Sequence, residues 1–385
     1  MTENNTQPKK ILIFSMSYYP RFVGGAEVAL REITERLNLI DFELHLITLR
    51  YDSLLPKQEK IGNIFVHRIG FSKKSPTFED LRAFPLRLSK VLYQFWAPLV
   101  GLWLHRKIKF EKVWVMMAHS AGVPGNIFSR ISQVPLLLSL QEGDPTDHVE
   151  KQMKIFGPFF TGVFSQAKQI QAISEFLKDW AIKMKAQVIP QVVPNGVDSE
   201  MFVSNERSFE SSTFRLIVKA VDLIIEALAI LPEEVHLDVV GDGFQRNLLE
   251  KKVAQFGLQK RVTFYGHKDK KEVIQLLQSA HVFIRPSRSE GLGNSFLDAM
   301  AVGLPIIGTP VGGIPGFIFD PHTPEDEATG LFCEVESSQS IVACIERLMF
   351  NKVLYEKISS NAKILIQEKY TWNKISLKMK ELLLV

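Results

Sequence analysis

The 385-residue sequence contains only two cysteines, Cys333 and Cys344. Two cysteines cannot form a disulfide framework, and neither has zinc-ligand spacing, so we expect a reducing, cytoplasmic compartment. Residues 1–10 are polar and have no apolar core, which argues against a signal peptide. The net charge is only +4, and the dispersed basic residues come with no nucleic-acid recognition motif. These absences exclude a disulfide-stabilised secreted domain and argue against a nucleic-acid partner.

Long hydrophobic runs are also missing. The segment 91–104 has fourteen residues, which is too few to span a bilayer, and Pro98 interrupts it. Its two tryptophans and basic flanks are typical of a helix in the membrane interface, but a helix buried under a sheet explains the pattern equally well. Residues 1–110 hold 17 Lys and Arg against 10 Asp and Glu. The basic N-terminal domain is therefore a candidate for peripheral contact with the inner face of a membrane or with a phosphorylated acceptor.

Length and composition predict two domains. A chain of 385 residues exceeds the size at which one hydrophobic core keeps growing. Apolar runs of strand type alternate with helical patterns, which favours doubly wound parallel sheets. The turn residues Pro194–Asp198 separate two such series. Strands are expected at 11–14, 43–49, 64–69, 113–117, 136–140, 169–173, 188–193, 236–240, 262–265, 282–284 and 305–310.

The segment Glu290–Asp298 carries the most informative pattern. It follows an apolar strand and a turn, and it opens a helix whose first residues, Asn294 and Ser295, are good N-cap types. Two carboxylates thus bracket a glycine-rich helix N-terminus, where backbone N–H groups and the positive end of the helix dipole form an anion site. A nucleotide sugar, which has both phosphates and hydroxyls, suits this arrangement. A capped helix with an exposed acid on either side explains the same residues.

The spacing of these two acids resembles the Glu-x7-Glu signature of the family 4 retaining glycosyltransferases, with Asp298 in place of the second glutamate. The resemblance implies the GT-B fold: two Rossmann-like, doubly wound parallel-sheet α/β domains that face a cleft, with a C-terminal helix crossing back to the N-terminal domain. We accordingly expect an acceptor-side domain at 1–194, with 1–9 as a disordered lead-in. A nucleotide-sugar domain is expected at 195–366, and the returning helix at 367–385.

The resemblance also assigns roles to individual residues. Glu290 is expected to face the donor sugar, and His119, just past the strand 113–117, to act with it, because ligands collect beyond the C-terminal ends of parallel strands. Both are predicted to be catalytic. The segment Gln141–His148 follows the next strand, where it supplies acceptor contacts or caps a loop. Donor binding is assigned to Gly24, Gly25, Arg215, Lys219, Gly241, His267, Leu292, Gly293, Asn294, Ser295 and Asp298.

Two of these donor-binding assignments rest on irregular sequence. The family has a strand, then Arg-Leu, a few residues, and Lys, and the two cations neutralise the leaving diphosphate. Here Arg215 and Lys219 match with one residue missing, and the upstream residues 210–214 are a poor strand. Either the first strand is displaced onto 214–218, or part of the usual segment is absent. Arg215 and Lys219 would then lie on a strand rather than in the loop after it.

The prediction is a metal-independent retaining glycosyltransferase that transfers sugar from a nucleotide diphosphate donor to a sugar or lipid-linked acceptor in polysaccharide or glycolipid assembly. The sequence contains no Asp-x-Asp motif, so no metal or other cofactor is expected. Alternatives are an epimerase or phosphorylase of the same fold, or a non-catalytic nucleotide-sugar-binding protein. The donor base, the sugar, the acceptor, the linkage and the oligomeric state do not follow from the sequence.

Overall fold

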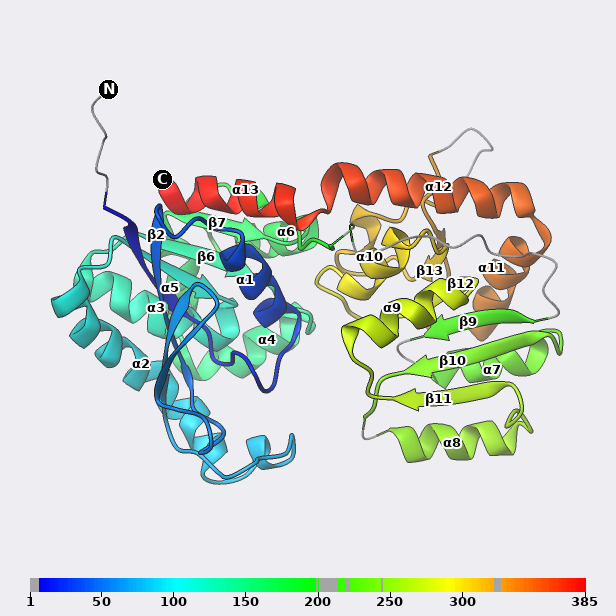
Figure 1. Cartoon of the computed structure of the whole chain (residues 1–385), viewed down its shortest axis with the longest axis horizontal. Coiled ribbons are helices and arrows are strands. Elements are labelled where there is room, and N and C mark those ends of the chain that lie inside the picture. Colours follow the sequence, from blue (N-terminus) through cyan, green and yellow to red (C-terminus); the bar gives the residue numbers. More distant parts are fainter. Residues whose placement is uncertain (1–6, 199, 201–212, 219–221, 244, 322–326) are drawn as a thin grey trace. The chain divides into compact units, whose positions relative to one another are not determined.

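The computed structural model describes residues 7–198, 200, 213–218, 222–243, 245–321 and 327–385. The chain divides into two compact units, one made of residues 1–195 and 372–385 and the other of residues 196–371. Figure 1 shows both as helices laid against a central sheet. The predicted boundary after residue 194 lies beside the observed one. The returning segment begins at Trp372 rather than at 367, because the preceding helix continues to Lys369.

The first unit is built on an eight-stranded sheet with the order β3-β4-β2-β1-β5-β6-β7-β8. All neighbouring strands are parallel except β3, which the sequence analysis did not predict and which runs antiparallel to β4. Central strands are apolar on both faces because helices cover both sides. The strands are β1 (Lys9–Phe14), β2 (Phe42–Leu49), β3 (Gln58–Ile61), β4 (Ile64–Ile69), β5 (Lys112–Met116), β6 (Leu136–Leu140), β7 (Gln169–Ala172) and β8 (Gln191–Val192).

Helices from both ends of the chain cover this sheet. The last helix packs its apolar side, including Trp372, Ile375 and Met379, into the same core as β1 and β2. The buried Nζ of Lys112 donates to the carbonyl oxygen of Leu382 at 2.5 Å. The helices of this unit are α1 (Gly25–Glu35), η1 (Asp80–Arg82), α2 (Leu86–Ile108), α3 (Ala118–Ser132), α4 (Thr146–Met153), η2 (Lys154–Phe156), α5 (Pro158–Gln166), α6 (Glu175–Lys183) and α13 (Trp372–Leu384).

The second unit has a six-stranded parallel sheet with the order β11-β10-β9-β12-β13-β14. Its strands are β9 (Phe214–Val218), β10 (Val235–Val240), β11 (Val262–Gly266), β12 (Val282–Arg285), β13 (Ile306–Gly308) and β14 (Leu331–Phe332). Its helices are α7 (Asp222–Ile230), α8 (Arg246–Gln255), α9 (Lys270–Ser279), α10 (Asn294–Ala301), η4 (Ile314–Gly316), α11 (Ser338–Phe350) and α12 (Lys352–Lys369).

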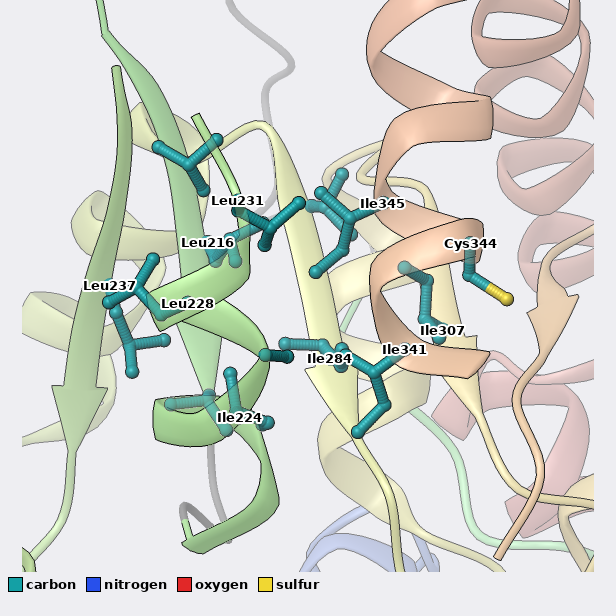
Figure 2. Close-up of a cluster of buried hydrophobic side chains, with 14 of the residues drawn as sticks. Leu216, Ile224, Leu228, Leu231, Leu237, Ile284, Ile307, Ile341, Cys344 and Ile345 are labelled. Carbon is teal, nitrogen blue, oxygen red and sulfur yellow. The ribbon is translucent and has the colours of Figure 1, made fainter. Parts of the chain in front are cut away.

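Aliphatic side chains from the strands and from α7 and α11 fill the core of the second unit. Figure 2 shows Leu216 of β9, Ile284 of β12 and Ile307 of β13 beside Leu228 and Ile341 from the two helices. Both cysteines are free and buried here, and burial is the main cause that raises the pKa of Cys344 to about 11. This core fixes β9 and β12 next to each other at the centre of the sheet.

The segment that left two interpretations open forms the continuous helix α2, with Pro98 inside it. One side is buried: the hydroxyl of Tyr93 donates to the carbonyl of Ile47 at 2.9 Å, and Gln94 Nε2 donates to the carbonyl of Ser120 at 3.2 Å. The other side carries apolar residues that stay exposed. No helix in the ranges given above combines the length and the hydropathy needed to cross a bilayer.

Candidate functional site

Each sheet has one place where the order of its strands reverses. In the first unit, β1 lies between β2 and β5. The chain runs outward from β1 through β2 on one side and continues from β5 outward on the other, so the strand order reverses at β1. In the second unit, β9 and β12 are neighbours in the same way. Ligands of open α/β sheets bind beyond the carboxyl ends of the strands at such a switch point. The loops after β1 and β5, and those after β9 and β12, are therefore the places to look for function.

His119 lies at the switch point of the first unit, in the first turn of α3. The buried carboxylate of Glu142, just past β6, accepts a hydrogen bond from the N–H of Ala118 at 2.6 Å and lies 3.4 Å from Nδ1 of His119. Glu142 Oε2 also accepts from the N–H of Gln141 at 2.9 Å. Because Met117 provides no side-chain cap for α3, the carboxylate supplies the anion that this helix N-terminus favours.

The same carboxylate controls the charge of the imidazole. Burial alone would lower the pKa of His119, but the hydrogen bond and charge of Glu142, together with the charge of Asp144, outweigh it and raise the pKa above 6.5. Sequence analysis named Glu142 only within the segment Gln141–His148. A carboxylate directly after a buried strand was the available signal. In the structure its carboxylate lies 3.4 Å from Nδ1 of His119 and raises the pKa of that imidazole.

The Gly24-Gly25 loop follows β1 and opens α1. The N–H of Gly24 donates to Oε2 of Glu27 at 2.8 Å, so a side chain of the chain itself already accepts from this helix N-terminus. Burial raises the pKa of Glu27, and hydrogen bonds from backbone N–H groups oppose that rise. A donor phosphate at this loop would therefore meet the Glu27 carboxyl group beside the glycine amides.

Glu290 is buried in the loop after β12 and lies against a cation. Its Oε1 is 2.6 Å from Nη2 of Arg285, the last residue of the strand, and the two side chains are 9% and 22% exposed. Nη1 of Arg285 donates to Ser295 Oγ at 3.1 Å. Its Nε is buried without a hydrogen-bond partner among the residues the structure describes. Arg285 thus joins the strand end, Glu290 and the first turn of α10.

Sequence analysis did not assign Arg285, although an arginine just before Pro286 at the end of an apolar strand was a usable signal. The loop after β13 was expected only as a loop, whereas in the structure it contacts the main chain of Glu290. The N–H of Gly313 donates to the carbonyl of Glu290 at 3.0 Å. A methyl group at Gly312 would lie 1.8 Å from that carbonyl oxygen, and the φ of Gly312 is +56°. Only glycine fits this position.

The remaining residues of the predicted signature lie on or beside α10. Gly293, with φ +93°, is the N-cap, so Asn294 and Ser295 are the first residues of the helix rather than its caps. Leu292 is buried, whereas Asp298, one turn further along the helix, is half-buried. Gly293 has no side chain that could cap the helix, which leaves this end suited to an anion from a ligand.

Arg215 lies on a strand, as the first of the two alternatives predicted. It is the second residue of β9, and the carboxyl end of that strand is three residues away, at Val218. Its guanidinium is 3.6 Å from Asp238 Oδ2 on β10. Burial raises the pKa of Asp238, and the Arg215 charge opposes the rise. Lys219 follows β9 directly in the sequence and lies outside the described residues.

Gly241 and His267 follow the neighbouring strands β10 and β11. The N–H of Gly241 donates to the carbonyl of Gly266 at 2.9 Å, which ties the two strand ends together. Gly241, with φ +116°, has open space where a side chain would stand, and His267 is exposed. Both face solvent at the same edge of the sheet as Glu290. Across the described ranges, no three His, Cys, Asp or Glu side chains gather as a metal site would require.

Two family models match the chain. The model described as Glycosyltransferase Family 4 matches residues 23–201, and the model described as Glycosyl transferases group 1 matches residues 214–365. A glycosyltransferase of Methanocaldococcus jannaschii is 25% identical over 374 residues, which are 95% of this chain and 95% of that protein.

Solved structures of similar fold match nearly the whole chain. Sucrose-phosphate synthase from Thermosynechococcus elongatus has a TM-score of 0.78 at 17% identity, over 97% of this chain and 98% of that one. Anabaena HepE, solved in complex with UDP-glucose, has a TM-score of 0.73 at 20% identity, over 97% and 99%. With family models on both units and this architecture, the chain belongs to the family 4, group 1 glycosyltransferases and has the GT-B fold.

Proposed function

We propose that this glycosyltransferase is a retaining enzyme that transfers a sugar from a nucleotide diphosphate sugar to an acceptor hydroxyl, without a metal ion, in polysaccharide or glycolipid assembly. The observation that carries the proposal is the buried Glu290 at the switch point of the second unit. It is ion-paired with Arg285 and lies beside the N-terminus of α10, whose N-cap residue Gly293 has no side chain. The Glu290 carboxylate can accept hydrogen bonds from sugar hydroxyls, and the helix N-terminus can bind a phosphate group within one turn of it.

In the proposed reaction, the bond between the anomeric carbon and the β-phosphate oxygen breaks. The acceptor oxygen forms its bond on the same face of the sugar, and its proton passes to the departing β-phosphate. Charge grows on the diphosphate, so donors fixed in advance lower the barrier. The groups proposed for this task are the first-turn amides of α10, Arg285, and Lys219. Arg285 is the last residue of β12, whereas Arg215 lies three residues before the carboxyl end of β9, which makes Arg285 the better placed of the two arginines.

His119 is proposed to contact the donor sugar from the first unit. Glu142 holds its ring and favours its protonated form. A cationic imidazole can donate a hydrogen bond to a sugar hydroxyl and also stabilise negative charge near the leaving group. The loop at Gly24 and Gly25 is proposed to approach the donor phosphates. Asp298 is proposed to bind the ribose.

The donor to test first is UDP-glucose, because a structure of similar fold holds it. The purified chain is incubated with a panel of uridine, guanosine and adenosine diphosphate sugars, with sugar acceptors and lipid extracts, and release of the nucleoside diphosphate is measured. We expect release with one donor class, a retained anomeric configuration in the product, and the same rate in EDTA. Glu290→Gln should lower release about 100-fold, whereas Glu233→Gln, a change of an exposed acid in the same unit, should leave it unchanged. Release at the wild-type rate in Glu290→Gln would contradict the proposed site.

The compartment we propose is the cytoplasm. Cys333 and Cys344, the two cysteines of the sequence, are both free, as is usual under reducing conditions. Nucleotide sugars and a lipid-linked acceptor would then meet the enzyme at the inner face of the membrane. Fractionation of cells that express the tagged chain, before and after a high-salt wash, tests this placement.

A further inference from the structure

The outer face of α2 is apolar where a surface helix is normally polar. Seven large apolar side chains lie on it, each between 36% and 64% exposed. They recur at helical spacing along four turns, so they form one stripe. They are Leu88, Val91, Leu92, Phe95, Trp96, Leu99 and Trp103. Soluble chains rarely expose a contiguous apolar surface of this kind unless it binds something. We call these seven residues the α2 stripe.

The stripe cannot turn inward, because the opposite side of α2 is already buried. Tyr93, Ala97 and Gly101 face the sheet and are buried. A methyl group at Gly101 would lie 3.1 Å from side-chain atoms of Leu12 and Phe14, so the helix packs directly on β1. The stripe is therefore a fixed surface feature of the first unit.

Neighbouring elements extend the apolar surface. The ring of Phe95 lies 6.2 Å from the ring of Phe156 in η2. Next to Phe156, Ile155 is 85% exposed, and Phe159 at the start of α5 is 48% exposed. The α2 stripe and this corner form one patch, with side chains from two separate segments of the chain.

The charged residues that α2 contributes around the patch are all Lys or Arg. Residues 81–110 contain six Lys and Arg and no Asp or Glu. Arg87 begins the stripe, and Arg106 and Lys107 end it. Within the described ranges, no carboxylate comes within ion-pair distance of these three side chains. Lys107 Nζ lies 4.0 Å from the centre of the Trp103 ring. Lys151 and Lys154 are exposed beside Ile155.

We propose that the α2 stripe docks the enzyme on an anionic lipid bilayer. Tryptophan and phenylalanine enter the boundary between headgroups and acyl chains, and cations at both ends of the stripe meet lipid phosphates. A second copy of the chain fits less well, because a two-fold contact through the stripe would bring Arg87 of one copy toward Arg106 and Lys107 of the other. This inference concerns the first unit and does not depend on the donor chemistry. If the proposed function holds, docking brings the enzyme to acceptors embedded in lipid.

The distribution of tryptophan supplies a direct test. Of the five tryptophans, Trp96 and Trp103 are exposed on the stripe, whereas Trp114, Trp180 and Trp372 are buried. Vesicles of phosphatidylcholine, with or without phosphatidylglycerol, are added to the full chain. We expect a blue shift of the emission and quenching by brominated acyl chains only with phosphatidylglycerol, and loss of binding in high salt. An unchanged spectrum with anionic vesicles would overturn the proposal.

Variants distinguish binding through the α2 stripe from non-specific adsorption to vesicles. Trp96→Ser with Trp103→Ser, and separately Arg106→Glu with Lys107→Glu, should each weaken co-sedimentation with anionic vesicles at least about tenfold. The matched control is Ile131→Ser, which removes an apolar side chain that is 61% exposed elsewhere on the same unit, and should leave binding unchanged. Equal loss in the control would overturn the proposal.

Size-exclusion chromatography with light scattering tests whether a second copy of the chain, rather than a membrane, covers the α2 stripe. A dimer that dissociates in the double tryptophan variant would assign the stripe to a second copy and overturn the membrane proposal. Nucleoside diphosphate release with a water-soluble acceptor should be unchanged in the same variant. Failure of vesicle binding with intact release would leave the proposed reaction standing, and the reverse result would leave the docking surface standing.

Discussion

Replacement of Arg285 by methionine tests the central contact of the candidate site. Methionine keeps much of the apolar stem but leaves Glu290, whose side chain is only 9% exposed, without the cation 2.6 Å away. Removing one partner of a buried ion pair costs about 3–5 kcal/mol. Arg285 is itself 22% exposed, so we expect the lower end, about 3 kcal/mol. That figure includes about 1 kcal/mol for the lost hydrogen bond to Ser295.

The matched control is Arg288→Met, on the same loop. Arg288 is 59% exposed and pairs with Glu336 and Asp222 at 2.8 and 3.4 Å, so its loss should cost under about 1 kcal/mol. All five tryptophans lie outside residues 196–371. Unfolding of the second unit in urea is therefore followed by circular dichroism, and tryptophan emission reports the first unit. A difference under about 0.5 kcal/mol between the two variants would refute the buried-pair argument.

Four further predictions concern single residues at or beside the proposed site. Glu290→Gln should lower turnover about 100-fold with donor binding retained, and a wild-type steady-state rate would remove Glu290 from the site. Asp298→Ala should weaken nucleotide diphosphate binding by roughly 1–3 kcal/mol, and a wild-type affinity by calorimetry would remove Asp298 from the site. Glu142→Gln should destabilise the first unit most at acid pH. Because the pKa of His119 is raised in the folded state, its interaction with Glu142 contributes its full stability below pH 6.5 and loses it as the pH rises through the folded-state pKa. A stability difference from wild type that does not shrink as the pH rises would contradict this coupling. Gly312→Ala should destabilise the second unit by at least about 2 kcal/mol, since alanine at φ +56° is strained and its methyl meets the carbonyl of Glu290; an unchanged urea midpoint by circular dichroism would be inconsistent with that contact.

The sequence predicted the parts of the fold that local patterns determine. Apolar runs such as Leu136–Leu140, with Ser139 as its one polar residue, are typical of strands covered on both faces, and the structure has this strand at the predicted bounds. The displacement of the second unit's first strand onto Phe214–Val218 was one of two alternatives, because the missing residue shortened the segment without saying where. The strand β3 was missed because Gln58–Ile61 is polar and pairs only at the sheet edge.

The sequence indicated segments that contribute to the candidate site, but not the contacts between their residues. The pattern around Glu290 identified the helix N-terminus, and the structure places it at the switch point of the sheet. Arg285 and Glu142 were not predicted as site residues, because their contacts with Glu290 and His119 form only in the folded chain. Gly312 is far from Glu290 in the sequence, and no local pattern predicts that their main chains touch.

The return of α13 to the first sheet makes that unit discontinuous in sequence, whereas residues 196–371 form the other unit without interruption. The first unit joins the two ends of the chain: Lys9 Nζ donates to the carbonyl of Leu384, 375 residues away. During synthesis, the second unit can complete its contacts as soon as its last helix has emerged, because its strands and helices are local. The first unit remains incomplete until the final residues leave the ribosome, with the cavity for Trp372 and Met379 still open to water. A nascent chain from which Thr371 has just emerged would thus hold a complete second unit and an incomplete first unit.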